Sequence, residues 1–134
     1  MSNPDLTGSW QLDTTSAWDD EGTPMPAPFG PTPRGLVAFY DNGRMMCVLT
    51  DGRVDMPPGE VREYSTYTGQ YQYDGQHLIT RVDGSVDTDR IGGDQVREVE
   101  FVGERLILRP PVRTRDGRRE HRQLEWIRRT DATS

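Results

Sequence analysis

Tyrosine is concentrated in one stretch of the chain, "EYSTYTGQYQYDG" at 63–75, which holds four of the five tyrosines. A tyrosine side chain combines an apolar ring with a polar hydroxyl, so it can fill a core, line a pocket, or donate and accept a proton. Because side chains alternate across a strand, Tyr67, Tyr71 and Tyr73 share one face. We predict that this face points inward, whereas Tyr64 belongs to the preceding loop.

Arg97 is the least expected residue in the strand predicted over 95–102. The even positions of this strand include two glutamates, which suit solvent, so Arg97, Val99 and Phe101 are predicted to face inward. A buried guanidinium needs a counter-charge or several hydrogen bonds. Tyrosine hydroxyls, carbonyls and an internal carboxylate could satisfy it, or it could anchor a carboxylate, enolate or carbonyl of a ligand. The opposite parity would instead place Arg97 outside.

Neighbouring strands supply further inward candidates. In the strand at 77–82, alternation favours a face that includes Thr80, which would lie beside the tyrosines. In the last strand, Trp126 shares its face with Leu124 and is predicted to form part of the inner wall, whereas parity does not decide the faces of 44–50. The candidate ligand-binding residues are Tyr67, Tyr71, Tyr73, Thr80, Arg97, Phe101 and Trp126, and the candidate catalytic residues are Tyr71, Tyr67 and Arg97.

Other reactive or metal-binding residue types do not form a recognised site in the sequence. His77 and His121 are too far apart for a local metal-binding pair, so no metal is expected. Cys47 lies in an apolar run without a basic neighbour, which favours a core thiol over a nucleophile. The segment 87–98 partly matches a calcium loop, but Ile91 stands at a ligand position and no helices flank it. Because no phosphate loop, nucleophile elbow or dinucleotide fingerprint is present, no cofactor is expected.

Composition and charge argue against several functional classes. The net charge is −6 and no basic stripe is evident, so nucleic acid is not an expected partner. All 16 basic residues are arginine, which excludes Schiff-base catalysis because that chemistry needs an amine. No apolar segment is long enough to span a membrane and the first residues do not resemble a signal peptide. We therefore expect a soluble, cytoplasmic protein without membrane contact.

The elements that position these residues are predicted to be strands. The 134 residues suit one domain over 1–134, and 14 glycines, 10 prolines and 32% hydrophobic residues favour turns and a thin core over a helical bundle. Asn-Gly and Asp-Gly signals mark hairpins. The predicted strands are 9–13, 36–40, 44–50, 67–73, 77–82, 95–102, 105–109, 112–115 and 121–128. We predict an all-β fold, a single antiparallel up-and-down barrel of about eight strands, since closure removes sheet edges.

One proline-rich segment interrupts this rhythm. The residues "EGTPMPAPFGPTPRG" at 21–35 include five prolines, which cannot donate the hydrogen bonds of a central strand. We predict a long ordered loop that carries Met25 and Phe29. It is either a connector whose apolar side chains plug one barrel end or a lid over a ligand mouth.

Several short motifs together resemble one known family. They are "LTGSWQL" at 6–12, "GPTPRGLVAFYDNGRM" at 30–45, "YTGQYQYDGQHLITRVDGS" at 67–85, "GGDQVREVEFVGERLIL" at 92–108 and "LEW" at 124–126. In order and spacing they resemble the bacterial lipocalin-like domain family, whose fold is a calycin-type β-barrel. The resemblance covers nearly the whole chain. It implies a small antiparallel barrel with a central cavity.

The resemblance also carries expectations for single residues. In calycin barrels the tryptophan of the first strand packs at one barrel end beneath a C-terminal arginine, which implies that Trp10 lies beneath Arg128 or Arg129. Relatives often carry a histidine in the strand after the tyrosine hairpin, and Thr80 stands at that position here. Any chemistry that depends on that histidine would be missing from this chain.

The inward residues permit two functions of different classes. The first is binding of a small, mainly apolar or carboxylated or carbonyl-bearing molecule in an aromatic-lined cavity with Arg97 as polar anchor. The second is a cofactorless isomerase, cyclase, dehydratase or hydratase, in which a pocket tyrosine acts as acid or base and Arg97 stabilises negative charge. A filled barrel that acts only through its surface is a third option. Both a monomer and a homodimer are compatible with the sequence.

Overall fold

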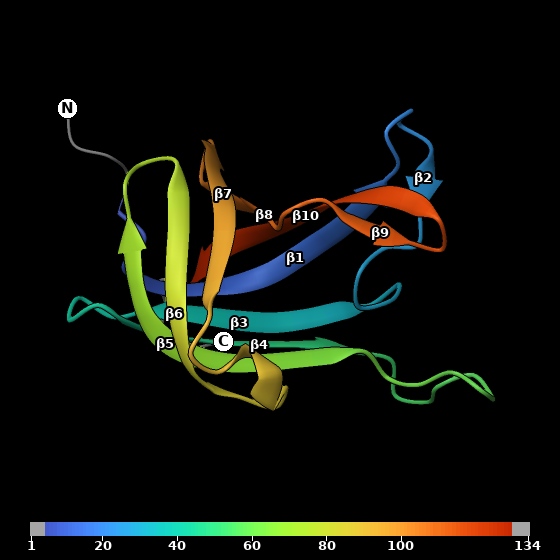
Figure 1. The fold of residues 1–134 in the computed structure, drawn as a ribbon, viewed down its shortest axis with the longest axis horizontal. Coiled ribbons are helices and arrows are strands. Elements are labelled where there is room, and N and C mark those ends of the chain that lie inside the picture. Colours follow the sequence, from blue (N-terminus) through green and yellow to red (C-terminus); the bar gives the residue numbers. More distant parts are fainter. Residues whose placement is uncertain (1–4, 130–134) are drawn as a thin grey trace.

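Residues 5–129 are described by the computed structural model of the chain and form a closed antiparallel β-barrel (Figure 1). The strands are β1 (Gly8–Trp18), β2 (Pro24–Met25), β3 (Pro33–Phe39), β4 (Arg44–Asp51), β5 (Tyr64–Tyr73), β6 (His77–Ser85), β7 (Asp94–Val102), β8 (Arg105–Arg109), β9 (Arg113–Arg115) and β10 (Arg118–Arg129), with a 3₁₀ turn, η1 (Thr88–Arg90), before β7. The sheet order is β2-β1-β3-β4-β5-β6-β7-β8-β10-β9, and β1 also pairs with β10. This pairing closes a ring of eight strands and confirms the predicted fold class.

Tight turns join the strands where the sequence indicates them. Gly43, between β3 and β4, has a φ of 86°, and Gly75, between β5 and β6, has a φ of 97°. Residues with a Cβ rarely adopt this conformation, so glycine suits these hairpin turns. Most strands extend beyond their predicted ends. The first reaches Trp18 because it pairs with β10 along nearly its whole length, with one irregularity between Leu12 and Thr14.

The apolar side chains of each strand define its inward face. In β4, whose faces parity did not decide, Cys47 and Leu49 are buried, whereas Met46 and Val48 are 42% and 49% exposed. The predicted inward faces of the neighbouring strands are confirmed by the burial of Tyr67, Leu78, Thr80, Val82, Leu124 and Trp126. In β7, Val99 and Phe101 pack against this core from the same face as Arg97.

Tyr64 departs from the prediction. It is the first residue of β5 rather than part of the preceding loop, and it pairs with Thr50 of β4. Because β4 continues to Asp51, it provides a pairing partner that extends β5 at its start. The Tyr64 side chain is 56% exposed, as its parity opposite to that of Tyr67 requires.

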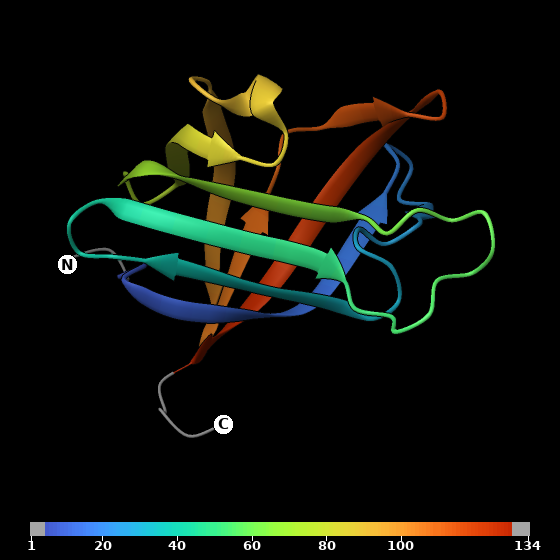
Figure 2. The same ribbon diagram turned by 90° about the horizontal axis from the view of Figure 1, so that it is seen from below.

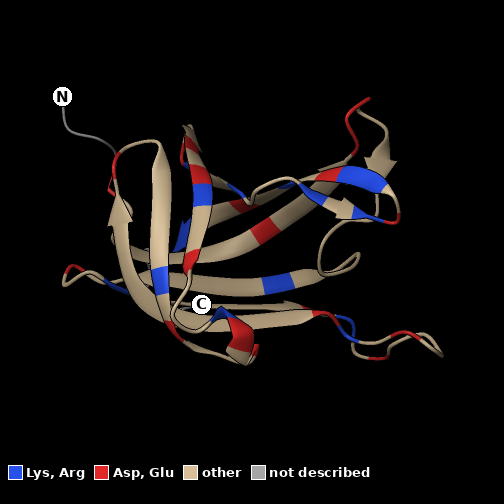
Figure 3. Cartoon of the chain, viewed as in Figure 1, with Lys and Arg blue, Asp and Glu red and all other residues tan. Residues whose placement is uncertain are grey.

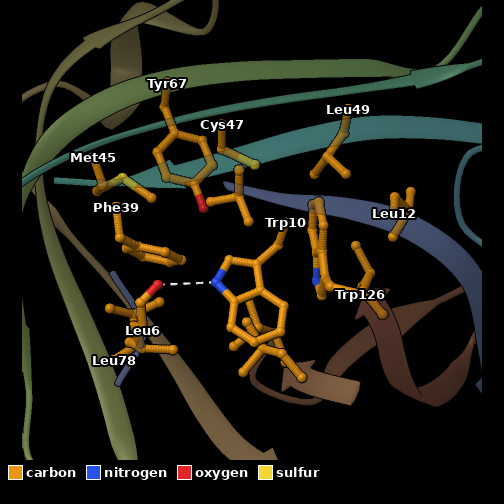
Figure 4. Packing of buried hydrophobic residues seen from close by; sticks show 14 of the residues in the cluster. Leu6, Trp10, Leu12, Phe39, Met45, Cys47, Leu49, Tyr67, Leu78 and Trp126 are labelled. Atoms are coloured by element: carbon orange, nitrogen blue, oxygen red, sulfur yellow. Dashed lines mark hydrogen bonds between the residues drawn. The ribbon is translucent and has the colours of Figure 1, made fainter. Parts of the chain in front are cut away.

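Trp10 is buried in the core, and Figure 4 shows its indole nitrogen directed toward Leu6. Its Nε1 donates a hydrogen bond to the carbonyl oxygen of Leu6 at 2.9 Å. The guanidinium carbon of Arg128 lies 4.0 Å from the centre of the Trp10 ring. Arg128 also donates hydrogen bonds to the carbonyl oxygens of Thr7 and Asp5 at 2.6 and 2.7 Å. The expected packing of Trp10 beneath a C-terminal arginine is confirmed.

The proline-rich segment contributes side chains to the opposite half of the barrel. Met25 and Phe29 are both buried, and Phe29 belongs to the main core cluster. The backbone N–H of Phe29 donates to Oε1 of Glu63 at 2.7 Å. Two strands depart from the loop predicted over 21–35: β2 at Pro24–Met25 pairs with β1, and β3 begins at Pro33. A proline can begin a strand because its missing N–H is not required at that position.

Acidic and basic residues are interspersed along the strands (Figure 3). Exposed ion pairs join different strands. Arg81 of β6 pairs with Asp94 of the adjacent β7, and Arg44 of β4 pairs across β5 with Asp83 of β6, each with an N–O distance of 2.6 Å. Pairs of this kind contribute about 0–1 kcal/mol each, so the core rather than the surface charge stabilises the barrel. Within residues 5–129, no helix has the length and apolar character needed to cross a membrane.

Candidate ligand-binding cavity

A cavity of about 230 Å³ lies in the barrel on the side of the core away from Trp10. Its apolar lining includes Phe29, Cys47, Leu49, Leu108, Leu124 and Trp126. Its charged lining is formed by Glu63, Asp87, Arg90, Arg97, Arg113 and Arg122. Figure 4 shows the side chains of Cys47, Leu49 and Trp126 pointing into the barrel interior. The cavity therefore combines an apolar wall with a strongly cationic one. It also argues against a barrel filled completely by its own side chains.

Tyr67 and Cys47 form a buried polar pair in the cavity wall. They lie directly opposite each other on β5 and β4 and interact through their side chains. Burial raises the pKa of the Cys47 thiol to about 12 and also raises the pKa of the Tyr67 hydroxyl. Both groups are therefore protonated and neutral at physiological pH. They can donate a hydrogen bond, but neither is a ready base or nucleophile.

Arg97 and Arg90 place two guanidinium groups on one side of the cavity. Both donate to Oε1 of Gln95, Arg90 with an N–O distance of 3.2 Å. Arg97 also donates to the carbonyl oxygen of Val96 at 2.8 Å, and Arg90 to the hydroxyl of Ser65 at 2.9 Å. No aspartate or glutamate among residues 5–129 forms an ion pair with either arginine.

The electrostatic consequence is a lowered pKa at Arg97. Burial is the main cause, and the nearby positive charge of Arg90 adds to it. The guanidinium nevertheless remains charged, because an arginine titrates far above neutral pH. Two positive charges thus share neutral hydrogen-bond acceptors instead of a carboxylate, and an anion between them would be favourable.

Arg122 and Arg113 form the other charged side of the cavity, around a buried carboxylate. Glu120 is fully buried. Its Oε1 lies 2.5 Å from Nε of Arg113 and 3.6 Å from Nε of Arg122, and its Oε2 lies 3.5 Å from Nη1 of Arg115. Burial and the charge of Arg113 lower the pKa of Arg122 to about 10. One carboxylate therefore faces three guanidinium groups.

Several buried polar atoms in or beside the cavity have no hydrogen-bond partner in the described part of the chain. Three of them are donors, Nε1 of Trp126, Nε of Arg122 and Nε2 of Gln95, and one is an acceptor, Oε2 of Glu120. A buried donor without a partner costs roughly 1–3 kcal/mol. Trp126 and Arg122 line the cavity directly. An acceptor-bearing ligand could relieve this cost, whereas a purely apolar one could not.

The structure brings only some of the predicted site residues together. Tyr67, Arg97 and Trp126 line the cavity. Tyr71 does not, because its hydroxyl donates to the carbonyl oxygen of Tyr40 at 2.9 Å and its ring packs against Phe39. Tyr67 lines the cavity and Tyr71 does not because the cavity lies beside the first half of β5, whereas Tyr71 belongs to the second half.

Three further candidates share this displacement from the cavity. Tyr73 is partly buried against the core, and Thr80 is buried opposite Tyr71 on β6. Phe101 packs on Trp10 with ring centres 6.1 Å apart, at the barrel end that holds Trp10, which we call the closed end. All three face inward as predicted, but none is part of the cavity lining.

Sequence reasoning missed several lining residues. Arg122 lies on the same face of β10 as Leu124 and Trp126, so the alternation that identified Trp126 could have found it by one further step. Arg90 comes from η1, in a loop where no periodic signal indicates direction. Glu63 also precedes its strand. Tertiary contacts position the side chains of loops, so the order of residues in a loop does not indicate which of them point into the barrel.

No metal site is indicated in the described region. No group of three or more His, Cys, Asp or Glu side chains among residues 5–129 has a geometry suited to a metal ion. His121 lies away from the cavity, with Nε2 2.7 Å from Oδ1 of Asp20 and its ring stacked on Trp18. The candidate site is therefore built from arginine, aromatic and aliphatic side chains.

The closed eight-stranded antiparallel barrel and its internal cavity define a small β-barrel of the lipocalin-like class. The family model described as "Lipocalin-like domain" matches residues 7–129. The chain belongs to this family, as the motifs at its first strand, tyrosine hairpin and last strand indicated. A search of curated proteins finds no match to the sequence. Membership of the family supports small-molecule binding in general terms.

Proposed function

We propose that this protein binds a small, mainly apolar organic anion in the barrel cavity, with Arg97 as the polar anchor. The observation that carries the proposal is the state of Arg97. Its guanidinium lines the cavity, donates to Gln95 and Val96, and forms no ion pair with a carboxylate among residues 5–129. A ligand carboxylate could accept two hydrogen bonds from a guanidinium and supply this missing charge.

The apolar wall restricts the size and character of the ligand. A cavity of about 230 Å³ lies below the usual range of roughly 300–1,000 Å³ for sites of drug-sized molecules. Leu49, Leu108 and Leu124 offer it aliphatic contacts, and Trp126 offers an aromatic one. A compact ring system with one acidic substituent fits this combination.

The residues give less support to a cofactorless enzyme. A catalytic tyrosine works best with a pKa near neutral pH, and burial moves the pKa of Tyr67 in the opposite direction. The hydroxyl of the other catalytic candidate, Tyr71, donates a hydrogen bond to a backbone carbonyl outside the cavity. Glu63 is a carboxylate of the cavity lining that could act as a base, but it accepts a hydrogen bond from the N–H of Phe29. Binding is therefore the function that we advance.

The test is the affinity of Arg97→Met for 1-naphthoate, measured by isothermal titration calorimetry. Hydrogen bonds to a charged group contribute about 1.5–3 kcal/mol, so the Kd should rise by about 10- to 100-fold. Arg81→Met is the matched control, because Arg81 is an exposed arginine of the adjacent strand and pairs with Asp94. Equal affinity of Arg97→Met and wild type would overturn the role of Arg97. Absence of naphthoate binding to wild type would overturn cavity binding of this ligand class.

A further inference from the structure

The barrel wall is interrupted between β7 and the β9–β10 hairpin. The strand β7 pairs with β8 only through Glu98–Val102, so its first residues have no partner on that side. The strand β10 pairs with β8 only through Leu124–Ile127. The chain between β8 and β9 contains Pro110 and Pro111, which cannot donate ladder hydrogen bonds. The first part of β7 and the first part of β10 are therefore not bridged by a strand.

A groove of about 560 Å³ lies on the outside of this interruption. Four residues line both the groove and the internal cavity, and all four are arginines: Arg90, Arg97, Arg113 and Arg122. They come from η1, β7, β9 and β10. Figure 2 shows η1 and the β9–β10 hairpin on the same side of the barrel. The gap is thus an opening through the wall whose edge is formed by guanidinium groups.

The charge at this opening exceeds what one carboxylate can balance. Arg90 and Arg97 form no ion pair within residues 5–129. Arg113 and Arg122 share Glu120, which a third arginine also approaches. Burial lowers the pKa of Arg122 to about 10, and the nearby positive charges of Arg113 and Arg97 add to this effect. A singly charged ligand group would leave positive charge uncompensated.

The acidic residues nearby are engaged elsewhere or lie at the rim. Asp94 accepts a hydrogen bond from Nε of Arg81 at 2.6 Å, on the outer surface. Asp87 accepts the N–H of Asp89 and caps η1, and both are exposed. Glu63 accepts the N–H of Phe29. None of these carboxylates forms an ion pair with the four arginines at the opening.

We propose that the opening is an anion subsite that holds a doubly charged phosphate monoester group, while the apolar part of the same ligand lies in the cavity. This inference deepens the proposed function and depends on it for the apolar half of the ligand. Guanidinium groups bind phosphate oxygens through paired hydrogen bonds, and several of them can converge on one phosphate. Because the opening reaches the outer groove, the charged group need not be enclosed, and this lowers the cost of its dehydration.

The experiment compares three probes that share one ring system: 1-naphthyl phosphate, 1-naphthoate and 1-naphthol. We expect the phosphate to bind at least about tenfold more tightly than the carboxylate, because its second negative charge and additional oxygen can accept further charged hydrogen bonds from the arginines. The naphthol should be the weakest. Calorimetry on the full chain measures all three. Equal Kd values for phosphate and carboxylate would overturn the dianion subsite and leave the proposed function intact.

The ionisation of the phosphate gives a second readout. Its second pKa is about 6, so roughly a tenth of it is dianionic at about pH 5, and its Kd should rise about tenfold between about pH 7 and about pH 5. The carboxylates of Glu63, Asp87, Asp89, Asp94 and Glu120 face or flank the site, and their titration would affect 1-naphthoate equally. A parallel change for both probes would therefore overturn the proposal.

Substitutions at the opening separate this subsite from the cavity anchor. Arg90→Gln and Arg122→Gln should each weaken 1-naphthyl phosphate by about tenfold or more and 1-naphthoate much less. Arg81→Gln is the control and should change neither. Because Arg122 contacts the buried Glu120, Arg90→Gln keeps the test valid if Arg122→Gln does not fold. If these substitutions weaken the binding of both probes by the same factor, the proposal of a separate phosphate subsite is wrong.

Binding of inorganic phosphate shows which of the two proposals fails, the phosphate subsite or ligand binding in the cavity. If it binds wild type with a millimolar Kd, and Arg90→Gln abolishes that binding, the subsite stands even where naphthoate and naphthol do not bind. The cavity function alone would then be wrong. If inorganic phosphate and naphthyl phosphate both fail to bind while naphthoate binds, the subsite is wrong and the cavity function stands.

Discussion

The two ends of this barrel each hold an inward-facing arginine, and the two differ in how it is satisfied. Arg128 at the closed end lies over the ring of Trp10 and donates to two backbone carbonyl oxygens. Arg97 at the cavity end shares the side-chain oxygen of Gln95 with a second arginine. The first arrangement is complete within the chain, because each hydrogen bond ends on the protein's own backbone. The second leaves charge available to a ligand.

This difference separates stability from function along one axis of the molecule. The closed end packs the aromatic rings of Trp10 and Phe101 against the core, so removal of atoms there must leave a void. The cavity end contains buried donors without partners, such as Nε1 of Trp126, which cost folding free energy. We expect the side chains of the closed end to raise the free energy of unfolding. We expect those of the cavity end to bind the ligand and to contribute less to that free energy.

The largest expected effect is that of Trp10→Ala at the closed end. Truncation of a buried tryptophan typically lowers the free energy of unfolding by about 3–5 kcal/mol, and this variant also loses the hydrogen bond to Leu6. Urea denaturation measures the change. A loss below about 1 kcal/mol would mean that the closed end does not carry the stability of the barrel.

The sharpest form of the comparison is the pair Arg128→Met and Arg97→Met. Arg128→Met loses two charge-assisted hydrogen bonds and should lower the free energy of unfolding by about 2–3 kcal/mol, with unchanged affinity for 1-naphthoate. Arg97→Met removes a partly buried cation without a carboxylate partner, so its stability should change by less than about 1 kcal/mol in either direction. Denaturation and calorimetry on both proteins measure this. If Arg128→Met and Arg97→Met lower the free energy of unfolding equally, the proposed difference between the two ends of the barrel is wrong.

A smaller effect is expected from alkaline pH, through the thiol in the cavity wall. Burial raises the pKa of Cys47 to about 12 in the folded protein, whereas an unfolded thiol titrates near about 8.5. The unfolded state therefore loses its proton first, and the contribution to stability is present below about pH 8.5 and declines above it. By about pH 10 the loss should reach about 2 kcal/mol.

Cys47→Ala provides the control for this pH dependence. The variant should show a shallower decline of the free energy of unfolding between about pH 8 and about pH 10 than wild type. The remaining slope should reflect Tyr67, whose pKa is also raised by burial. Identical slopes in wild type and Cys47→Ala would show that the thiol is not buried in solution.

Much of the fold follows from local signals that the sequence carries. Glycine at the hairpin turns and alternation in β5, β6, β7 and β10 predicted the strand pairs and their inward faces correctly, because both signals depend only on near neighbours in the chain. Parity could not decide the faces of β4, since both contain apolar residues. Only the pairing of Cys47 with Tyr67 across the sheet placed Met46 and Val48 outside.

The sequence by itself determined that the chain is all-β, that it closes as a lipocalin-like barrel, and that Arg97, Tyr67 and Trp126 face inward. Turn chemistry and two-residue periodicity are properties of the chain alone. Tertiary structure decided which inward residues meet a cavity and which fill the core. Tyr71 and Phe101 share faces with Tyr67 and Arg97, yet they lie further along their strands, in the packed half of the barrel. Position along the barrel axis depends on contacts between distant segments, and so does the meeting of Arg90 from η1 with the arginines of β7, β9 and β10 at the wall opening.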